Sequence, residues 1–394
     1  MLFIENFDTN FYYLINNLEG IFMDERIFLA VFLMIFLTIY GAINYYVLFK
    51  LSELFQLDRN ITFYLILIIL IISYLLANFL ASSINSMITK AFYYIAATYM
   101  GMVFITFCLL LLYDIISLIK PMPGIISGII VLCLMALLTI YSIINANTMQ
   151  ITTINLKSSK LVKPLNIVQI SDVHLGIING KQFLSRIIEK TNSLNPDIVL
   201  ITGDLIDGRF KYDPKDFQML NNLKGDVYFT IGNHETYAGI GVIEDLLKNT
   251  KVKMLRNELH KAGDIDKEIN IIGIDDSEDA LQVRTLLKQI SYKKSKYNIL
   301  MYHRPTGYKD AAAAQIDLML SGHTHGGQIY PFHYLITLVI RPVSGLHHII
   351  QSKNNQSQNE YSYLYISDGI GTWGPPMRLG TKAELSNIII NPDD

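Results

Sequence analysis

The chain has 394 residues and a formal net charge of −2, and its composition is 51% hydrophobic but only 17% charged, whereas soluble domains carry about a quarter charged residues. Residues 1–150 contain 13 charged residues and residues 151–394 contain 53. This division excludes a wholly soluble enzyme and a disordered chain, and the near-neutral balance lacks the basic character of a nucleic-acid-binding protein. Cys108 and Cys133 lie in apolar runs, so we expect neither a disulfide framework nor a thiolate zinc site.

Residues 1–150 are predicted to form a transmembrane region. Four apolar runs have the length of roughly 20 residues that crosses a bilayer, and they lie near residues 27–49, 61–80, 93–116 and 125–144. Asp114 is the one charged residue within these runs, and it lies near the end of its run. Because no ionisable residue in mid-membrane marks a transport pathway, we interpret the helices as an anchor rather than as a transporter or receptor.

The charges that flank the four runs predict an orientation. The first 26 residues are acidic and lack the basic segment of a cleaved signal peptide, and an even number of spans places both ends of the chain on one side. That side has five basic residues against three on the other, namely Arg26, Lys90, Lys157, Lys160 and Lys163 against Lys50, Arg59 and Lys120. The positive-inside rule then predicts that both ends of the chain, including the domain that follows the spans, lie on the cytoplasmic side.

Residues 151–394 are predicted to form one α/β domain, because short apolar runs alternate with amphipathic ones. The predicted strands are residues 165–170, 198–202, 227–231, 269–274, 298–302, 316–320, 361–366 and 385–390. The predicted helices are residues 182–193, 214–223, 240–248 and 280–289. The last two strands have no helix between them, so we expect a mixed sheet system.

Polar side chains follow five of the predicted strands. In chain order they are Asp172 and His174, then Asp204, then Asn233 and His234, then His303, and finally His323 and His325. Since the carboxyl ends of strands in α/β folds gather at one edge of the sheet, these side chains are expected to converge. Carboxylate, amide and neutral imidazole groups suit a pair of divalent metals bridged by one carboxylate. Each motif is weak alone, but five in order favour metal binding over solvated loops.

The ordered blocks D-x-H, G-D, G-N-H-E, H and G-H-x-H resemble the calcineurin-like metallophosphoesterase superfamily. A finer resemblance, to its bacterial membrane-associated branch, is carried by residues 169–176 (QISDVHLG), 201–208 (ITGDLIDG), 321–329 (SGHTHGGQI) and 374–380 (GPPMRLG). It spans roughly residues 165–390 and does not extend to the apolar runs. It implies a β-sandwich flanked by helices.

The resemblance also implies roles for the polar side chains. One metal would be held by Asp172, His174, Asp204 and His325, and the second by Asp204, Asn233, His303 and His323, with Asp204 bridging the two. His234 would bind the scissile phosphate by a hydrogen bond and protonate the leaving oxygen, which suits an imidazole. The donor set fits two divalent ions among Mn, Fe, Zn and Co, without choosing between them, and manganese is our choice for an assay.

Three further features have two interpretations each. Arg304 stands where relatives commonly have Gln, and it either binds phosphate or points to solvent. Trp373 and Arg378 either line a substrate cleft or belong to a rigid turn. In the cleft, the Trp373 ring would stack on the substrate and the Arg378 guanidinium would bind its phosphate. The apolar run at residues 329–350 is either a core strand and turn or a surface that dips into the bilayer.

The sequence as a whole predicts a membrane-anchored dinuclear-metal phosphoesterase. It would hydrolyse phosphodiester or pyrophosphate bonds with metal-activated water, on a phosphorylated small molecule, a lipid or a nucleotide-lipid. Beyond the lipid bilayer and this substrate, we predict no protein partner. The alternatives are a non-catalytic membrane scaffold or sensor that retains a metal site, and a receptor or transporter with a regulatory phosphoesterase domain.

Overall fold

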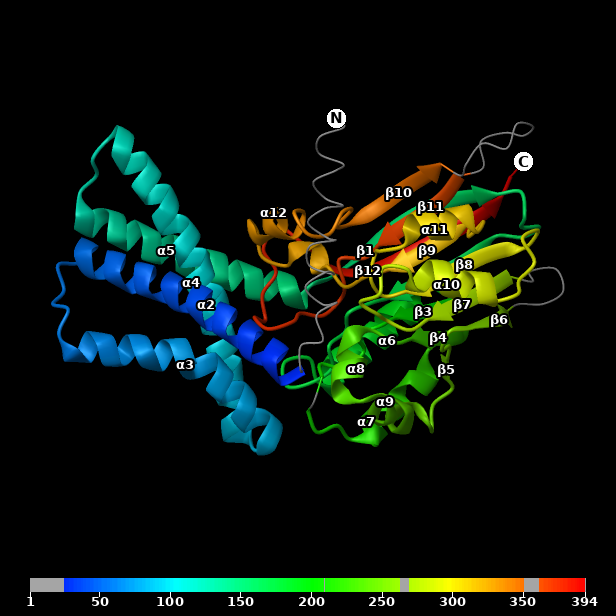
Figure 1. The fold of residues 1–394 in the computed structure, drawn as a ribbon, viewed down its shortest axis with the longest axis horizontal. Coiled ribbons are helices and arrows are strands. Elements are labelled where there is room, and N and C mark those ends of the chain that lie inside the picture. Colours follow the sequence, from blue (N-terminus) through cyan, green and yellow to red (C-terminus); the bar gives the residue numbers. More distant parts are fainter. Residues whose placement is uncertain (1–24, 209, 263–268, 351–360, 394) are drawn as a thin grey trace. The chain divides into compact units, whose positions relative to one another are not determined.

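A computed structural model describes residues 25–208, 210–262, 269–350 and 361–393 (Figure 1). The chain divides into two compact units. The first, called here the helical unit, comprises Met1–Ile143 and the short segment Gly374–Met377. The second, called the sandwich unit, comprises Ile144–Trp373 and Arg378–Asp394. The predicted domain boundary at residue 150 stays a prediction, although the division in the structure lies close to it.

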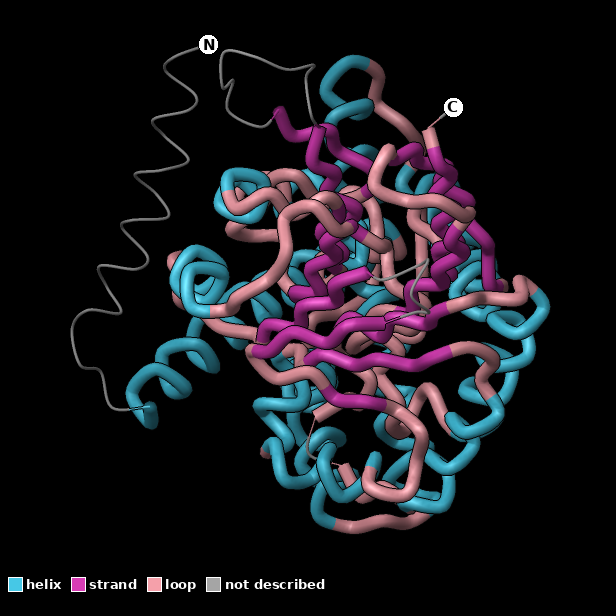
Figure 2. Tube along the Cα trace, turned by 90° about the vertical axis from the view of Figure 1, so that its right-hand side faces the viewer, coloured by secondary structure: helices cyan, strands magenta, loops and turns pink. Residues whose placement is uncertain are grey.

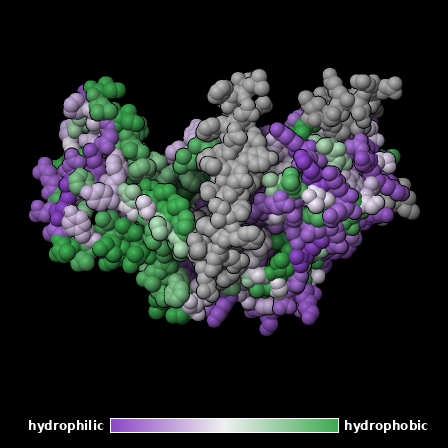
Figure 3. Space-filling model, in the orientation of Figure 1, coloured by the Kyte–Doolittle hydropathy of each residue, from purple (hydrophilic) through white to green (hydrophobic). Residues whose placement is uncertain are grey.

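The helical unit is built from four long apolar helices. They are α2 (Glu25–Leu54), α3 (Ile61–Ser83), α4 (Met87–Ile119) and α5 (Gly124–Asn147). Two of them begin at capping residues: the Asn60 side chain accepts hydrogen bonds from the first backbone N–H groups of α3, and Ser86 forms a capping box with Thr89 at the start of α4. All four have the length and composition to cross a membrane, which confirms the four predicted helices; Figure 3 shows their largely hydrophobic surface.

Two groups of polar side chains in the helical unit are paired across its helices. The Asp114 carboxylate accepts a hydrogen bond from the Tyr46 hydroxyl at 2.7 Å and lies 2.8 Å from the Lys50 ammonium. The Tyr99 hydroxyl donates to the buried side chain of Asn44 at 2.6 Å. Because an unpaired polar group in hydrocarbon is costly, these pairs stabilise the helices, and they include the one charge that the sequence places in a span.

Two six-stranded sheets form the sandwich unit. The first has the order β1-β12-β2-β3-β4-β5 and the second the order β10-β11-β9-β8-β7-β6. Strands β2 to β5 are parallel, as are β7, β8, β9 and β11. In the first sheet β1 and β12 form a parallel pair, and β12 runs antiparallel to β2; in the second sheet both edge strands, β10 and β6, are antiparallel to their neighbours. The bounds are β1 (Met149–Ser158), β2 (Leu165–Ile170), β3 (Ile198–Thr202), β4 (Asp226–Thr230), β5 (Lys253–Met254), β6 (Glu258–Ala262), β7 (Ile269–Ile274), β8 (Tyr297–Tyr302), β9 (Leu318–Ser321), β10 (Gly345–Ile350), β11 (Tyr361–Ile366) and β12 (Ala383–Pro392).

The two sheets pack face to face with helices on their outer faces (Figure 2). The central core joins residues of both sheets, such as Ile167 and Leu200 with Ile299 and Leu320. The outer face of the first sheet is covered by α6 (Lys181–Ser193), η1 (Gln218–Asn222) and α9 (Ile240–Leu247), and that of the second by α10 (Gln282–Gln289) and α11 (Tyr308–Ala313). This arrangement confirms the predicted β-sandwich flanked by helices.

Two segments differ from the predicted elements. The ten-residue strand β1 follows α5 with a single residue between them, in a segment where the sequence pattern predicts no strand. The apolar run at residues 329–350 is not a core strand: it contains the short helix α12 (Phe332–Ile336), which has no buried residue, followed by the edge strand β10. Apolar composition alone does not show which face of a chain segment the fold covers.

Candidate metal centre

The predicted site residues lie where five strands end. Strands β2, β3 and β4 of the first sheet run into the loops that carry Asp172, Asp204 and Asn233, respectively. Strands β8 and β9 of the second sheet run into His303 and the His323-Thr324-His325 loop. Both sheets therefore present polar side chains at the same edge of the sandwich, as the strand-end pattern predicts.

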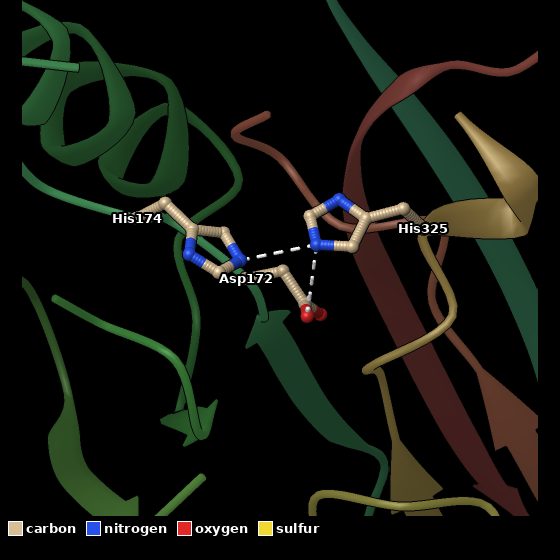
Figure 4. Close-up of side chains that lie close together, drawn as sticks. All are labelled: Asp172, His174 and His325. Atoms are coloured by element: carbon tan, nitrogen blue, oxygen red, sulfur yellow. Dashed lines mark hydrogen bonds and ion pairs between the residues drawn. The ribbon is translucent and has the colours of Figure 1, made fainter. Parts of the chain in front are cut away.

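Asp172, His174 and His325 form one cluster of potential ligand atoms (Figure 4). The Nε2 atoms of the two histidines face each other at 3.0 Å, and His325 Nε2 lies 3.5 Å from Oδ1 of Asp172. All three residues are buried. Two imidazole nitrogens and a carboxylate oxygen directed to one point are a donor set for a divalent cation.

Asp204, His303 and His323 form a second cluster. Oδ2 of Asp204 lies 3.1 Å from Nε2 of His303 and 3.7 Å from Nε2 of His174, which belongs to the first cluster. Nδ1 of His323 lies 2.9 Å from the side-chain oxygen of Asn233. The Asp204 carboxylate thus faces both clusters, which is the position of a bridging ligand.

Unsatisfied atoms and backbone conformation show that these residues fit metal ions. Nδ1 of His174 and Nε2 of His303 are buried without a hydrogen bond of regular geometry among the described residues. Their neighbours are carboxylate oxygens of Asp207 at 3.5 Å and of Asp204 at 3.1 Å, so nitrogen and oxygen donors face one another at the distance at which both could bind one cation. Five of the predicted ligands have positive φ, namely Asp172, His174, Asp204, His323 and His325. Non-glycine residues rarely adopt this conformation, and they do so mainly at functional sites.

The electrostatics of the clusters also suit cations. Burial alone would lower the pKa of His303, but the carboxylates of Asp204 and Asp172 outweigh it and raise this pKa to about 10. A field that holds a proton so firmly on an imidazole attracts positive charge. Burial lowers the pKa of His174, His323 and His325, so these imidazoles are neutral and offer lone pairs.

Two glycines give the carboxylate and histidine loops room to meet. Gly203 has a φ of +87°, and a Cβ atom added there would lie 2.6 Å from Nδ1 of His303. A Cβ atom added at Gly232 would collide with the Asp204 carboxylate. The absence of a side chain at these two positions therefore lets the ends of β3, β4 and β8 approach closely.

Comparison with known proteins identifies the family. The family model for calcineurin-like phosphoesterases matches residues 165–327. An uncharacterized metallophosphoesterase of Campylobacter jejuni is 32% identical over 386 residues, which cover 92% of this chain and 98% of that protein. The chain belongs to the calcineurin-like metallophosphoesterases. Its predicted superfamily is thereby confirmed.

Two further relatives match a smaller share. An uncharacterized metallophosphoesterase of Helicobacter pylori is 33% identical over 59% of this chain and 61% of that protein. A zebrafish (Danio rerio) transmembrane protein with metallophosphoesterase domain is 31% identical over 66% of this chain and 62% of that protein. A metallophosphoesterase domain thus occurs with membrane segments in a related protein as well.

Two buried carboxylates of this metallophosphoesterase site were not predicted. Oδ1 of Asp207 lies 3.6 Å from Nδ1 of His234 and 3.5 Å from Nδ1 of His174, and burial raises the pKa of Asp207 to about 7. The Glu235 carboxylate accepts hydrogen bonds from the backbone N–H groups of Asp204, Ile206 and Gly232 at 2.8 to 3.1 Å, and it thereby fixes the Asp204 loop. Glu235 closes the G-N-H-E block and Asp207 stands in residues 201–208 (ITGDLIDG), so their position in these motifs was the available signal.

The three candidate substrate residues lie in different surroundings. Trp373 is 53% exposed, and its ring packs edge-on against that of His234 with centroids 6.0 Å apart, a position from which it can contact substrate. The Arg304 guanidinium pairs with Asp276 at 2.9 Å and Glu278 at 2.9 Å. These two carboxylates engage Nε and Nη2 of the guanidinium, so the structure favours neither phosphate binding nor free exposure to solvent.

Arg378 differs from its expected role as a phosphate fork. Its side chain is fully buried, and it donates to the backbone carbonyls of four residues, His325, Asp368, Gly369 and Gly371. Burial lowers its pKa to about 10. With its donors engaged, the guanidinium holds the His325 loop against the loop that follows β11, which matches the alternative interpretation of a rigid turn.

Proposed function

We propose that this chain is a membrane-anchored phosphoesterase that hydrolyses phosphodiester or pyrophosphate bonds with two divalent cations. The observation that carries the proposal is the Asp204 carboxylate, which lies within 3.7 Å of ligand nitrogens in both clusters. Asp172, His174 and His325 would hold one ion with Asp204, and Asn233, His303 and His323 the other. Two such ions lower the pKa of a water molecule and neutralise charge on phosphoryl oxygens.

The chain's own residues supply the remaining chemistry. Nδ1 of His234 faces Asp207, so Nε2 is the atom left to protonate the leaving oxygen. Burial lowers the pKa of His234, and the carboxylates of Asp204 and, to a smaller extent, Asp207 partly offset this effect. The protonated fraction of the imidazole would act as the general acid. The exposed face of Trp373 beside His234 is suited to contact the leaving group.

The four apolar helices make a membrane-borne substrate the favoured class. A phospholipid or nucleotide-diphospho-lipid would present its phosphate where the anchored enzyme resides. We place the sandwich unit on the cytoplasmic side of a bacterial inner membrane, with manganese as the ion for assay. A scaffold or sensor that keeps the metals for stability is the alternative, but it has no use for a histidine and carboxylate pair such as His234 and Asp207.

The test is hydrolysis by the full-length protein in detergent. Bis(p-nitrophenyl) phosphate and p-nitrophenyl phosphate are assayed with manganese and with a chelator, beside the variant Asp204→Asn. We expect metal-dependent turnover that favours the diester and is nearly abolished in Asp204→Asn, together with loss of bound metal. Turnover that is unaffected by the chelator and by Asp204→Asn would overturn the proposal. Full metal binding without hydrolysis of these esters or of phospholipids would favour the scaffold.

A further inference from the structure

The sandwich unit exposes an apolar surface on α12 and the turn that follows it. Five large side chains within eight residues, called here the α12 patch, are 44% to 65% exposed: Phe332, Tyr334, Leu335, Leu338 and Val339. Elsewhere in the described part of this unit, exposed large apolar side chains are scattered along the chain, such as Val162 and Leu281. Scattered apolar residues are ordinary on a protein surface, whereas a contiguous patch marks an interaction site.

Charge around the α12 patch favours an anionic partner. From residue 318 to residue 359 the sequence contains no Asp or Glu, although the chain has 34. Beside the patch lies a cavity of about 670 Å³, lined by Arg341 and three histidines, His333, His347 and His348, and by no carboxylate. An apolar surface next to cationic and hydrogen-bonding groups is the combination found where proteins dock on membranes that contain anionic lipids.

The α12 patch is tied closely to the metal centre. His333, the second residue of α12, hydrogen-bonds the carbonyl of Gly326 at 3.1 Å through Nδ1. A Cβ atom added at Gly327 would lie 2.5 Å from the Cα atom of His333, so the two backbones are in direct contact. The α12 patch therefore lies beside the loop that carries His325, so a lipid bound at the patch would have its phosphate close to that loop.

We propose that the α12 patch docks on the surface of a bilayer containing anionic phospholipid. The apolar side chains enter the interfacial layer, and Arg341 and the cavity face the lipid phosphates. A bilayer is favoured over a protein partner because a single residue, Thr148, separates the apolar helix α5 from β1, and this short tether keeps the sandwich unit near the membrane. The inference deepens the proposed function. It rests on that function for one consequence, which is that docking brings lipid phosphates to the loop that carries His323 and His325.

The test measures where a label on the α12 patch resides. In the full-length protein with Cys108→Ser and Cys133→Ser, a cysteine at Leu338 carries an environment-sensitive fluorophore, and a cysteine at Leu281 is the matched control on an exposed apolar position of the same unit. Each protein is reconstituted in vesicles of phosphatidylcholine and phosphatidylglycerol, with and without nitroxide groups on the acyl chains. We expect blue-shifted emission and quenching by the nitroxides for Leu338→Cys and neither for Leu281→Cys.

The other outcomes contradict the proposal in distinct ways. Equal, water-like emission from both labels overturns docking. A blue shift without quenching by the lipid nitroxides shows that a second copy or another protein covers the patch, and quenching that is unchanged in pure phosphatidylcholine overturns the role of anionic headgroups. The labels report contact with the bilayer whether or not the protein hydrolyses a substrate. A quenched label at Leu338 in a protein that hydrolyses no ester would therefore refute the proposed function and leave docking intact.

The double variant Leu335→Glu/Leu338→Glu tests the consequence for catalysis. Because both side chains are exposed, the variant should fold and should hydrolyse a soluble diester like the wild type. We expect its turnover of a phospholipid in vesicles to fall relative to that soluble diester. An unchanged ratio would show that the patch does not deliver substrate.

Discussion

The two units of the chain hold their charged groups in different settings. In the helical unit the polar groups of Asp114, Lys50 and Tyr46 satisfy one another. In the sandwich unit Nδ1 of His174 and Nε2 of His303 are buried without a hydrogen bond of regular geometry, and they face carboxylate oxygens of Asp207 and Asp204. Paired groups stabilise a structure, whereas ligand atoms that a rigid fold holds without regular hydrogen bonds are prepared for a cation. The comparison indicates that the chemistry lies with the histidine and carboxylate clusters of the sandwich unit.

The largest effect is expected from His234→Ala, which removes a group of the sandwich unit that no structural role requires. Activity should fall on the order of 10² to 10⁴-fold because the leaving oxygen loses its acid, while bound metal stays at the wild-type level. Steady-state kinetics and elemental analysis of the purified protein measure the two quantities. Full activity in this variant would refute the role of His234, and loss of metal would instead make it a ligand.

The variant Arg378→Met tests the comparison at a buried side chain of the sandwich unit whose guanidinium is hydrogen-bonded to backbone carbonyls. The substitution leaves the His325 carbonyl and three carbonyls of the loop that follows β11 without this donor. We expect a loss of about 3 kcal/mol in the free energy of unfolding of the sandwich unit. Thermal unfolding in detergent is the measurement. The matched control is Arg284→Met, which removes an exposed ion pair with Asp310 and should cost less than about 1 kcal/mol. Equal effects of the two variants would contradict the structural role of Arg378.

Much of the fold and of the candidate site could be predicted because apolar runs and strand ends are local signals. The spans of α2 to α5, the strands β2, β3 and β7, and the convergence of the strand-end residues follow from patterns of a few residues. The strand β1 was missed because it is an edge strand with one exposed face, and its apolar content is correspondingly low.

Arg378 and the α12 segment show where local signals fail. The carbonyls that bind Arg378 come from loops after β9 and β11, and no spacing in the sequence shows that these loops meet. Nor does an apolar run reveal whether its side chains face the core or the solvent, which depends on elements distant in the chain. Asp207 belongs to the same class, because its contact with His234 joins the loops that follow β3 and β4.

The variant Asp207→Asn tests whether the carboxylate beside His234 contributes to the pKa of that histidine. The Asp207 carboxylate raises the pKa of His234, so its removal lowers that pKa. Since a general acid must be protonated, the decline of kcat at alkaline pH should begin at a lower pH than in the wild type. In addition, kcat near neutral pH should fall about 10 to 100-fold, as for other groups that orient active-site residues. A pH profile with an unmoved alkaline limb would show that Asp207 does not act through His234.

The smallest effect is expected in the helical unit, from Asp114→Asn. The amide can still accept the Tyr46 hydrogen bond, and the Asp114 side chain is 36% exposed, so the loss of the ion pair with Lys50 should lower the free energy of unfolding by less than about 1 kcal/mol. Metal content and kcat/KM should match the wild type. These quantities are measured beside Asp204→Asn, in which one aspartate-to-asparagine change of the same size abolishes both. If Asp114→Asn reduced turnover as strongly, the helical unit would take part in the chemistry, and the distinction between paired and unpaired polar groups would fail.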